Sequence, residues 1–234
     1  NATAGDLTVT AQQLTATGSL SASGNVALSG TNGISLAALN SGGTTGLLAN
    51  GAIVATDLRS AGAVTAFGRS IDISSGAGLT FGSTSAFAGN LSISTAQALN
   101  ATGTLSATGT VALVGTSGIT AGTVKSGGTS TLDSTGGILI SDLQSTGAVS
   151  ASGLSLDITS SGALAFDNAA AGAGTLRIAT AGDLTLANAS STDGMTLSSS
   201  GGSISSTGAV TAGGSFSADG ANGLNFASLS TADT

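Results

Sequence analysis

The chain contains very few residues that could do chemistry. Its 234 residues include no His, Cys or Glu, and its charged groups are 11 Asp against four Lys and Arg. Without imidazole or thiol groups, the usual zinc, haem and iron–sulfur sites cannot form, and neither Ser-His-Asp nor Cys-His catalysis is available. A net charge of −7 with scattered cations argues against nucleic-acid binding. The composition therefore predicts that the protein is not an enzyme and has no catalytic, cofactor-binding or metal-binding residues.

Two aspartates are candidates for contact with a ligand. Asp72 and Asp157 each lie between two apolar residues, so the alternation of a strand predicts that their carboxylates point outward. Such carboxylates could contact calcium or a polysaccharide. The favoured interpretation is that they are solvated and keep the surface soluble.

Aromatic residues, the usual platforms for carbohydrate binding, are limited to six Phe with no Tyr or Trp. Phe81 and Phe166 occupy equivalent places in alternating apolar segments, which predicts that both are buried. Phe67 and Phe216 lack this support from a repeat, and we expect them in the core as well.

The sequence repeats with a period of 85 residues. Residues 14–98 align without a gap on residues 99–183, and 43 of the 85 positions are identical. Residues 184–234 form a shortened third copy. Gapless duplication is typical of stacked modules, each of which contacts only its neighbours. Residues 1–234 are therefore interpreted as a single rod segment of a longer protein.

The four cations do not follow this repeat. Gln144 and Leu154 stand where the first copy has Arg59 and Arg69, so no basic stripe runs along the chain. A β-helical polysaccharide lyase would concentrate Asp with Lys or Arg on one face for proton abstraction. The sequence lacks that density, which disfavours the lyase as an alternative.

Short β-strands are predicted throughout. Apolar residues alternate with polar ones at many sites, such as Val26/Leu28 and Ile71/Ile73, and this is the period of a strand with one buried face. Gly-Ser, Asn-Gly and Gly-Gly pairs between these sites supply turns. No apolar stripe of helical period occurs, so the chain is predicted to be all-β.

We expect these strands to form a parallel β-helix (solenoid) with about three short strands per coil. Four coils per 85-residue repeat would give roughly 21 residues per coil and about 11 coils. Asp57 and Asp142 would then lie four coils, or about 19 Å, apart, too far to share one calcium ion. The alternative is an antiparallel β-sandwich or meander, which would explain the strands but not the gapless repeat.

Several segments resemble filamentous-haemagglutinin-type repeats. They share the pattern Gly-x-Leu-x-[Val/Ile/Leu], or carry a Ser-Ala/Thr-Gly-Ala-Val-Thr/Ser-Ala block that begins at residue 60, 145 or 206. The Gly-x-Leu segments are Gly5-Asp-Leu-Thr-Val9, Gly89-Asn-Leu-Ser-Ile93, Gly174-Thr-Leu-Arg-Ile178 and Gly182-Asp-Leu-Thr-Leu186. The resemblance covers essentially the whole chain.

The resemblance implies a right-handed parallel β-helix in a large exoprotein that a Gram-negative bacterium exports by two-partner secretion. The expected function is the structural shaft of a secreted surface adhesin, including biofilm-matrix adhesins, with a secreted or cell-surface location. Expected partners are exopolysaccharide or host and bacterial surface glycans, the outer-membrane transporter during secretion, and neighbouring rods. No cofactor, nucleic acid or transmembrane segment is expected. A carbohydrate-binding β-helix module and an ice-binding β-solenoid remain as alternatives.

Overall fold

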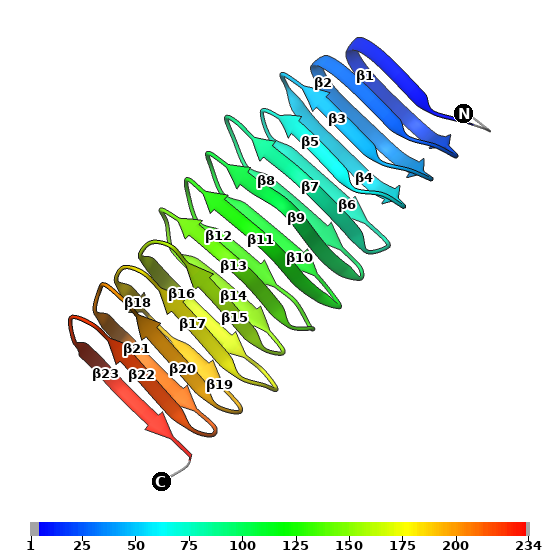
Figure 1. The fold of residues 1–234 in the computed structure, drawn as a ribbon. Helices are drawn as coiled ribbons and strands as arrows, with labels where there is room; N and C mark the ends of the chain where they lie inside the picture. Colours follow the sequence, from blue (N-terminus) through cyan, green and yellow to red (C-terminus); the bar gives the residue numbers. More distant parts are fainter. Residues whose placement is uncertain (1–4, 233–234) are drawn as a thin grey trace.

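The chain winds into a parallel β-solenoid. The computed structural model describes residues 5–232, which form about 12 turns of roughly 19 residues and contain no helix. Figure 1 shows the turns stacked along one axis, from β1 near the N-terminus to β23 near the C-terminus. At ~4.8 Å per turn the stack is about 55 Å long. Of the expected segment 1–234, residues 1–4 and 233–234 lie outside the described residues.

The described residues form 23 strands, most of them short. Their bounds are β1 Leu7–Ala22, β2 Val26–Ser41, β3 Thr45–Ala49, β4 Ala52–Ser60, β5 Val64–Gly68, β6 Ile71–Ser75, β7 Leu79–Ala86, β8 Leu91–Thr95, β9 Ala98–Ala107, β10 Val111–Gly115, β11 Gly118–Ser126, β12 Ser130–Asp133, β13 Ile138–Ser145, β14 Val149–Gly153, β15 Leu156–Ser160, β16 Leu164–Ala171, β17 Leu176–Thr180, β18 Leu184–Leu186, β19 Ala189–Ser191, β20 Met195–Ser199, β21 Ile204–Ala212, β22 Phe216–Gly220 and β23 Leu224–Thr231.

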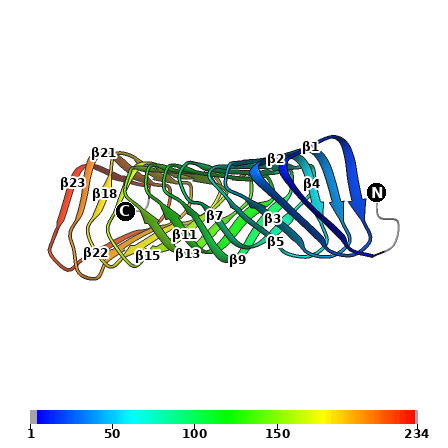
Figure 2. The same cartoon turned by 90° about the horizontal axis from the view of Figure 1, so that it is seen from above.

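Every pairing between the described strands is parallel, which confirms the predicted β-helix and excludes the antiparallel sandwich or meander. A strand pairs with the strand one turn further along the chain, as β1 does with β2 and β20 with β22. In Figure 2, which shows the rod from above, the strands lie side by side along its length and form its sides. The right-handed winding stays a prediction of the resemblance.

Each turn contains three straight segments, and each segment belongs to its own ladder along the rod. β1 pairs with β2 over three stretches separated by shifts in register, which are Leu7–Ala11, Gln13–Ala16 and Ser19–Ala22. We call the ladders that begin with these stretches the first, second and third ladders. Consecutive segments often merge into one bent strand, so 23 strands are enough for about 12 turns of three segments.

The 85-residue repeat is not a whole number of turns. Four successive pairings of the second ladder connect Leu14 to Leu91, and Leu99, the equivalent of Leu14, lies on the segment after Leu91. One repeat therefore advances four turns and one third. The turn is shorter than the 21 residues expected, because that expectation divided the repeat by four. Equivalent residues of the two copies consequently lie on different ladders.

Inward-facing apolar side chains form one continuous core along the axis. On the second ladder, Ile34, Ile53 and Ile71 stack on one another, and each is at most 2% exposed. The residue that follows each of these isoleucines in its strand points outward, as the alternation in the sequence predicts. Burial of this row removes apolar surface from water in every turn, and the gain scales with the number of turns.

Glycine pairs form the sharp corner of the turn. A Cβ on Gly42 would lie 2.2 Å from the carbonyl oxygen of Ser23, and a Cβ on Gly127 would lie 2.2 Å from that of Thr108. In each case the close neighbour is backbone of the preceding turn, which cannot move aside like a flexible side chain. Glycine is therefore required at these two positions.

Buried serine hydroxyls satisfy carbonyl groups at these same corners. The Ser126 hydroxyl lies 3.1 Å from the carbonyl oxygen of Gly109 and 2.9 Å from that of Thr129. Its equivalent Ser41 reaches two carbonyl oxygens in the same way. A buried carbonyl without a partner is costly, so these small hydroxyl side chains allow the corner to be narrow and still hydrogen-bonded.

We predict that Gly127→Ala destabilises the rod, whereas Gly122→Ala in the same turn does not. The new Cβ at residue 127 meets backbone at 2.2 Å, but the nearest atoms to a Cβ at residue 122 are 3.9 Å away. Overpacking of this kind costs about 2 kcal/mol. Urea unfolding followed by circular dichroism should show a lower midpoint for the first variant only; equal midpoints would contradict the stacked-corner explanation.

Candidate functional site

The two aspartates singled out from the sequence point outward, as predicted, but they do not come together. Asp72 is exposed on the second ladder, opposite Val54 and Ser92. Asp157 forms an ion pair with Arg177 on the next turn, with Oδ1 2.7 Å from Nη1. Both partners are nearly half exposed, so this pair adds little stability. Within residues 5–232 neither aspartate belongs to a group of three or more metal-ligating side chains, whereas calcium requires six to eight oxygen ligands.

Of the four phenylalanines that the sequence places in the core, three lie at least partly there and one does not. Phe81 and Phe166 are buried, as predicted. Phe216 is half-buried and packs edge-on against Phe226, with ring centroids 5.6 Å apart. The expectation for Phe67 is wrong: it is 43% exposed, because it occupies an outward position of β5 beside the inward Ala66.

Outward-facing rows along the ladders carry mixed side chains. On the second ladder the successive outward residues are Ser35, Val54, Asp72, Ser92, Ala112, Thr131 and Ser150. This row does not present Thr once per turn, which is the regular array that ice binding would need. It also does not repeat a single polar group at one-turn spacing, as a uniform binding face would.

The ladders contain two breaks at equivalent positions of the repeat. Asp57–Ser60 in β4 pairs with the turn before it, but β4 pairs with β6 only through Ile53–Ala55. Asp142–Ser145 in β13 likewise pairs backward, and only Ile138–Ile140 pairs forward with β15. We call these places the first and second ladder breaks. They interrupt the third and the first ladder respectively, so Asp57 and Asp142 do not share a ladder.

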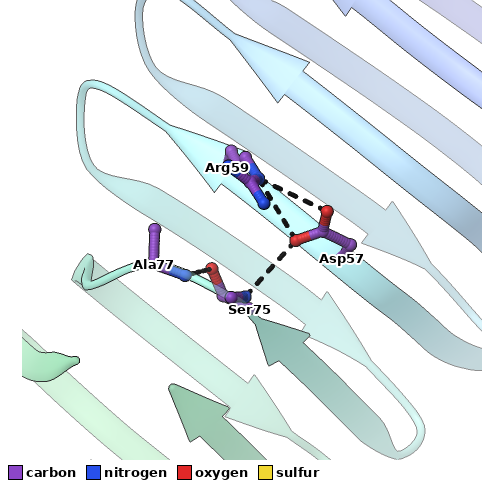
Figure 3. Close-up of polar contacts among 5 residues, drawn as sticks. Asp57, Arg59, Ser75 and Ala77 are labelled. Carbon is purple, nitrogen blue, oxygen red and sulfur yellow. Dashed lines mark hydrogen bonds and ion pairs between the residues drawn. The ribbon is translucent and has the colours of Figure 1, made fainter. Parts of the chain in front are cut away.

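At the first ladder break a side-chain carboxylate accepts a backbone hydrogen bond that a paired strand would otherwise accept. Asp57 Oδ1 accepts a hydrogen bond from the backbone N–H of Gly76 at 3.3 Å. Figure 3 shows Arg59 beside this carboxylate, and its Nε lies 3.3 Å from Asp57 Oδ2. Arg59 also covers Gly76, since a Cβ added to this glycine would lie 3.3 Å from Arg59 Nη2. The guanidinium group therefore fills this break.

At the second ladder break the equivalent aspartate also accepts a backbone hydrogen bond, but the side chains around it differ. Asp142 Oδ1 accepts a hydrogen bond from the backbone N–H of Ser161 at 2.9 Å. Asp142 Oδ2 accepts one from Gln144 Nε2 at 2.6 Å, and this nitrogen also lies 3.1 Å from the Ser161 hydroxyl. Lys125 lies opposite Gln144 on the preceding turn.

The pKa of Asp142 is below the ordinary value of an aspartate. Partial burial is the largest single influence and raises it, but the hydrogen bonds from Ser161 and Gln144 and the charge of Lys125 together outweigh burial. The pKa of Asp183 is also lowered, because it accepts hydrogen bonds from the backbone N–H and hydroxyl of Ser203. Both carboxylates therefore act as charged acceptors for backbone of the next turn.

The two breaks contain the same kinds of side chain in exchanged positions. Arg59 pairs with Asn40 of the turn before the first break, and Gln144 pairs with Lys125 of the turn before the second. Between the two copies, the amide at 40 becomes a cation at 125 while the cation at 59 becomes an amide at 144. The sequence shows that Gln144 replaces Arg59, but only the ladder register shows that Lys125 lies opposite this glutamine.

Neither break has the composition of a metal site. Within residues 5–232, no group of three or more His, Cys, Asp or Glu is arranged to bind a metal ion. The same part of the chain includes no helical segment with the length and hydropathy of a membrane span.

Comparison with known proteins identifies no family for this chain. No family model matches it, and neither does any curated protein or any solved structure. What the fold defines is a class, the parallel β-solenoid repeat proteins, with about 12 turns.

We predict that Asp142→Asn removes part of the pH dependence of stability. Because the folded-state pKa is lowered, the Asp142 carboxylate stabilises the rod above the ordinary aspartate pKa, and this contribution is lost as the pH falls through the lowered value. Thermal midpoints measured from about pH 6 down to pH 2 should therefore fall less steeply for Asp142→Asn than for the unaltered chain.

The cause of the lowered pKa can be checked by carbon-13 NMR of the carboxyl groups. Lys125→Met should raise the Asp142 pKa toward its ordinary value, and Arg69→Met, a cation removed elsewhere, should leave it unchanged. If neither substitution changes the Asp142 pKa, Lys125 does not act on this carboxylate.

Proposed function

We propose that this chain is the structural shaft of a secreted bacterial surface adhesin of the filamentous-haemagglutinin type. One observation carries the proposal: about 12 turns are joined by parallel ladders around one unbroken core. Separation along the axis is therefore fixed by backbone hydrogen bonds. A rod of this kind suits the task of holding a binding region at a defined distance from a cell.

The surface chemistry supports a mechanical role. The charged side chains with defined partners mostly serve the rod itself, since Asp57 and Asp142 bond backbone of the next turn and Asp157 pairs with Arg177. The chain lacks Cys, so export through an outer-membrane transporter would need no disulfide formation. Four Lys and Arg residues in all leave few sites for trypsin-like proteases.

In this proposal the rod is extracellular and is exported by two-partner secretion from a Gram-negative bacterium. Its partners are the transporter during export and, afterwards, exopolysaccharide, surface glycans or neighbouring rods. The alternative of a carbohydrate-binding module is favoured by one specific observation, the open hollow at the second ladder break, which is lined by Lys125, Gln144 and Ser161.

The shaft predicts one fixed distance between labels on the same ladder. The chain has no Cys, so Ser35→Cys and Ser150→Cys introduce unique labelling sites. Six pairings separate these outward positions, which corresponds to about 29 Å along the axis. Pulsed electron paramagnetic resonance between spin labels should give a single narrow distribution near this value, after allowance for the labels.

Deletion of residues 130–148 provides a matched control. Val111 pairs with Ser130 and Ser130 with Val149, so this deletion removes one whole turn and leaves the ladders in register. The label distance should shorten by about 4.8 Å and stay narrow. A broad distribution in the unaltered chain would overturn the stiff shaft.

The proposed location has its own test. Antibodies against this chain, applied to intact cells of the bacterium that makes it and viewed by electron microscopy, should label the outer surface or released filaments. Label that appears only after the cells are opened would refute the extracellular shaft.

A further inference from the structure

The second ladder break leaves an open hollow of about 520 Å³ on the side of the rod. It exists because Asp142–Ser145 has no strand paired ahead of it, so the chain from Ser160 to Ala163 forms the far wall. The lining includes the side chains of Lys125, Gln144, Thr146 and Ser161. All four groups are polar, and the hollow is open to solvent along the rod.

The hydrogen-bonding groups of this hollow are only partly used within the protein. Both oxygens of Asp142 accept hydrogen bonds, from Ser161 N–H and Gln144 Nε2. The Gln144 amide nitrogen is therefore engaged, which orients its carbonyl oxygen away from Asp142. Lys125 forms no ion pair with any carboxylate among residues 5–232. The Thr146 hydroxyl donates a hydrogen bond to the carbonyl oxygen of Gly127, and the Ser161 hydroxyl lies 3.1 Å from Gln144 Nε2. The hollow thus offers a ligand an ammonium group, an amide carbonyl and the remaining acceptor capacity of two hydroxyl oxygens.

The first ladder break shows what a closed version of the same structure looks like. There Arg59 lies within ion-pair distance of Asp57 and covers Gly76. The facing residue is Asn40, a neutral amide. The exchange of amide and cation between the copies therefore moves the positive charge out of ion-pair distance from its carboxylate, although the charge of Lys125 still lowers the Asp142 pKa. At the second break the charge becomes available for a negative group from outside.

We propose that the second ladder break binds a carboxylated sugar unit of an acidic polysaccharide. Lys125 pairs with the sugar carboxylate, and the Gln144 carbonyl and the hydroxyls of Thr146 and Ser161 bond the ring hydroxyls. A sugar carboxylate can pair with the ammonium group while the ring hydroxyls donate to these acceptor oxygens; a neutral sugar lacks the first interaction and a simple anion lacks the second. The source of the ligand rests on the proposed extracellular function.

Binding at this site is expected to be weak and sensitive to salt. The hollow is open, and its lining contains no aromatic platform. The single Lys125–carboxylate attraction is exposed to solvent and is screened at physiological ionic strength. Affinity for a long polymer would come from several such contacts along one chain rather than from one tight site.

Nitrogen-15 NMR of the full 234-residue chain tests the proposal, with a trimer of galacturonic acid as the probe. The backbone signals of Gln144, Thr146, Ser161 and Gly162 should shift in a saturable way at low salt. A neutral glucose trimer and a short poly-aspartate peptide serve as comparison ligands. Equal binding of the neutral trimer would overturn the role of Lys125, and equal binding of the peptide would overturn the role of the sugar hydroxyls.

A variant that keeps the net charge sharpens the test. The double variant Lys125→Asn with Gln144→Arg recreates the arrangement of the first break and should weaken binding of the acidic trimer roughly threefold at low salt. Lys125→Met should do the same, whereas Arg69→Met should have no effect. Unchanged binding in the double variant would overturn the proposal.

The two levels of interpretation fail separately. The remaining signals of each NMR spectrum report whether a variant is still folded, so loss of binding cannot be confused with loss of structure. Absence of binding in the unaltered chain would remove the sugar site, yet the label distances along the ladder would still support the shaft.

Discussion

The hydrogen bond between the backbone of one turn and the backbone of the next is the interaction on which the rest of this structure depends. It requires a segment to pair with another about 19 residues further along the chain, as Leu7 does with Val26. Once this register is kept, the backbone polar groups of the side walls are satisfied without help from side chains. The chain can therefore use small and uncharged residues almost throughout, which accounts for a charged fraction of 6%.

The same constraint explains the places where side-chain chemistry does matter. Where corners stack, backbone comes so close to residues such as Gly127 that no Cβ fits, and a serine hydroxyl must reach the carbonyls. Where a ladder breaks, a backbone N–H loses its strand partner, and Asp57 or Asp142 accepts its hydrogen bond. Asp57 and Asp142 thus act where the backbone pattern is interrupted, whereas Asp157 and Arg177 pair on an intact ladder.

Much of the fold could be predicted from the sequence, because alternation and gapless repetition both follow from stacked strands. The length of the turn was overestimated, since sequence identity marks the 85-residue period but does not reveal that it contains a fractional turn. The expectation for Phe67 is wrong because it rests on the size of the aromatic side chain, whereas the alternation after the inward Ala66 points this side chain outward. The placement of Lys125 opposite Gln144 could not be predicted, because it depends on which residues face each other across turns, and a linear sequence does not show that.

The fractional turn has a geometric consequence for any longer run of this repeat. Each copy is rotated by about a third of a circle relative to the copy before it, so equivalent side chains of successive copies would follow a helical path around the rod. Three copies would bring a feature back to its starting side after 13 turns, about 62 Å along the axis. Such a rod would offer its hollows to a surrounding mesh from every direction, whereas a repeat of whole turns would present them all to a single flat surface.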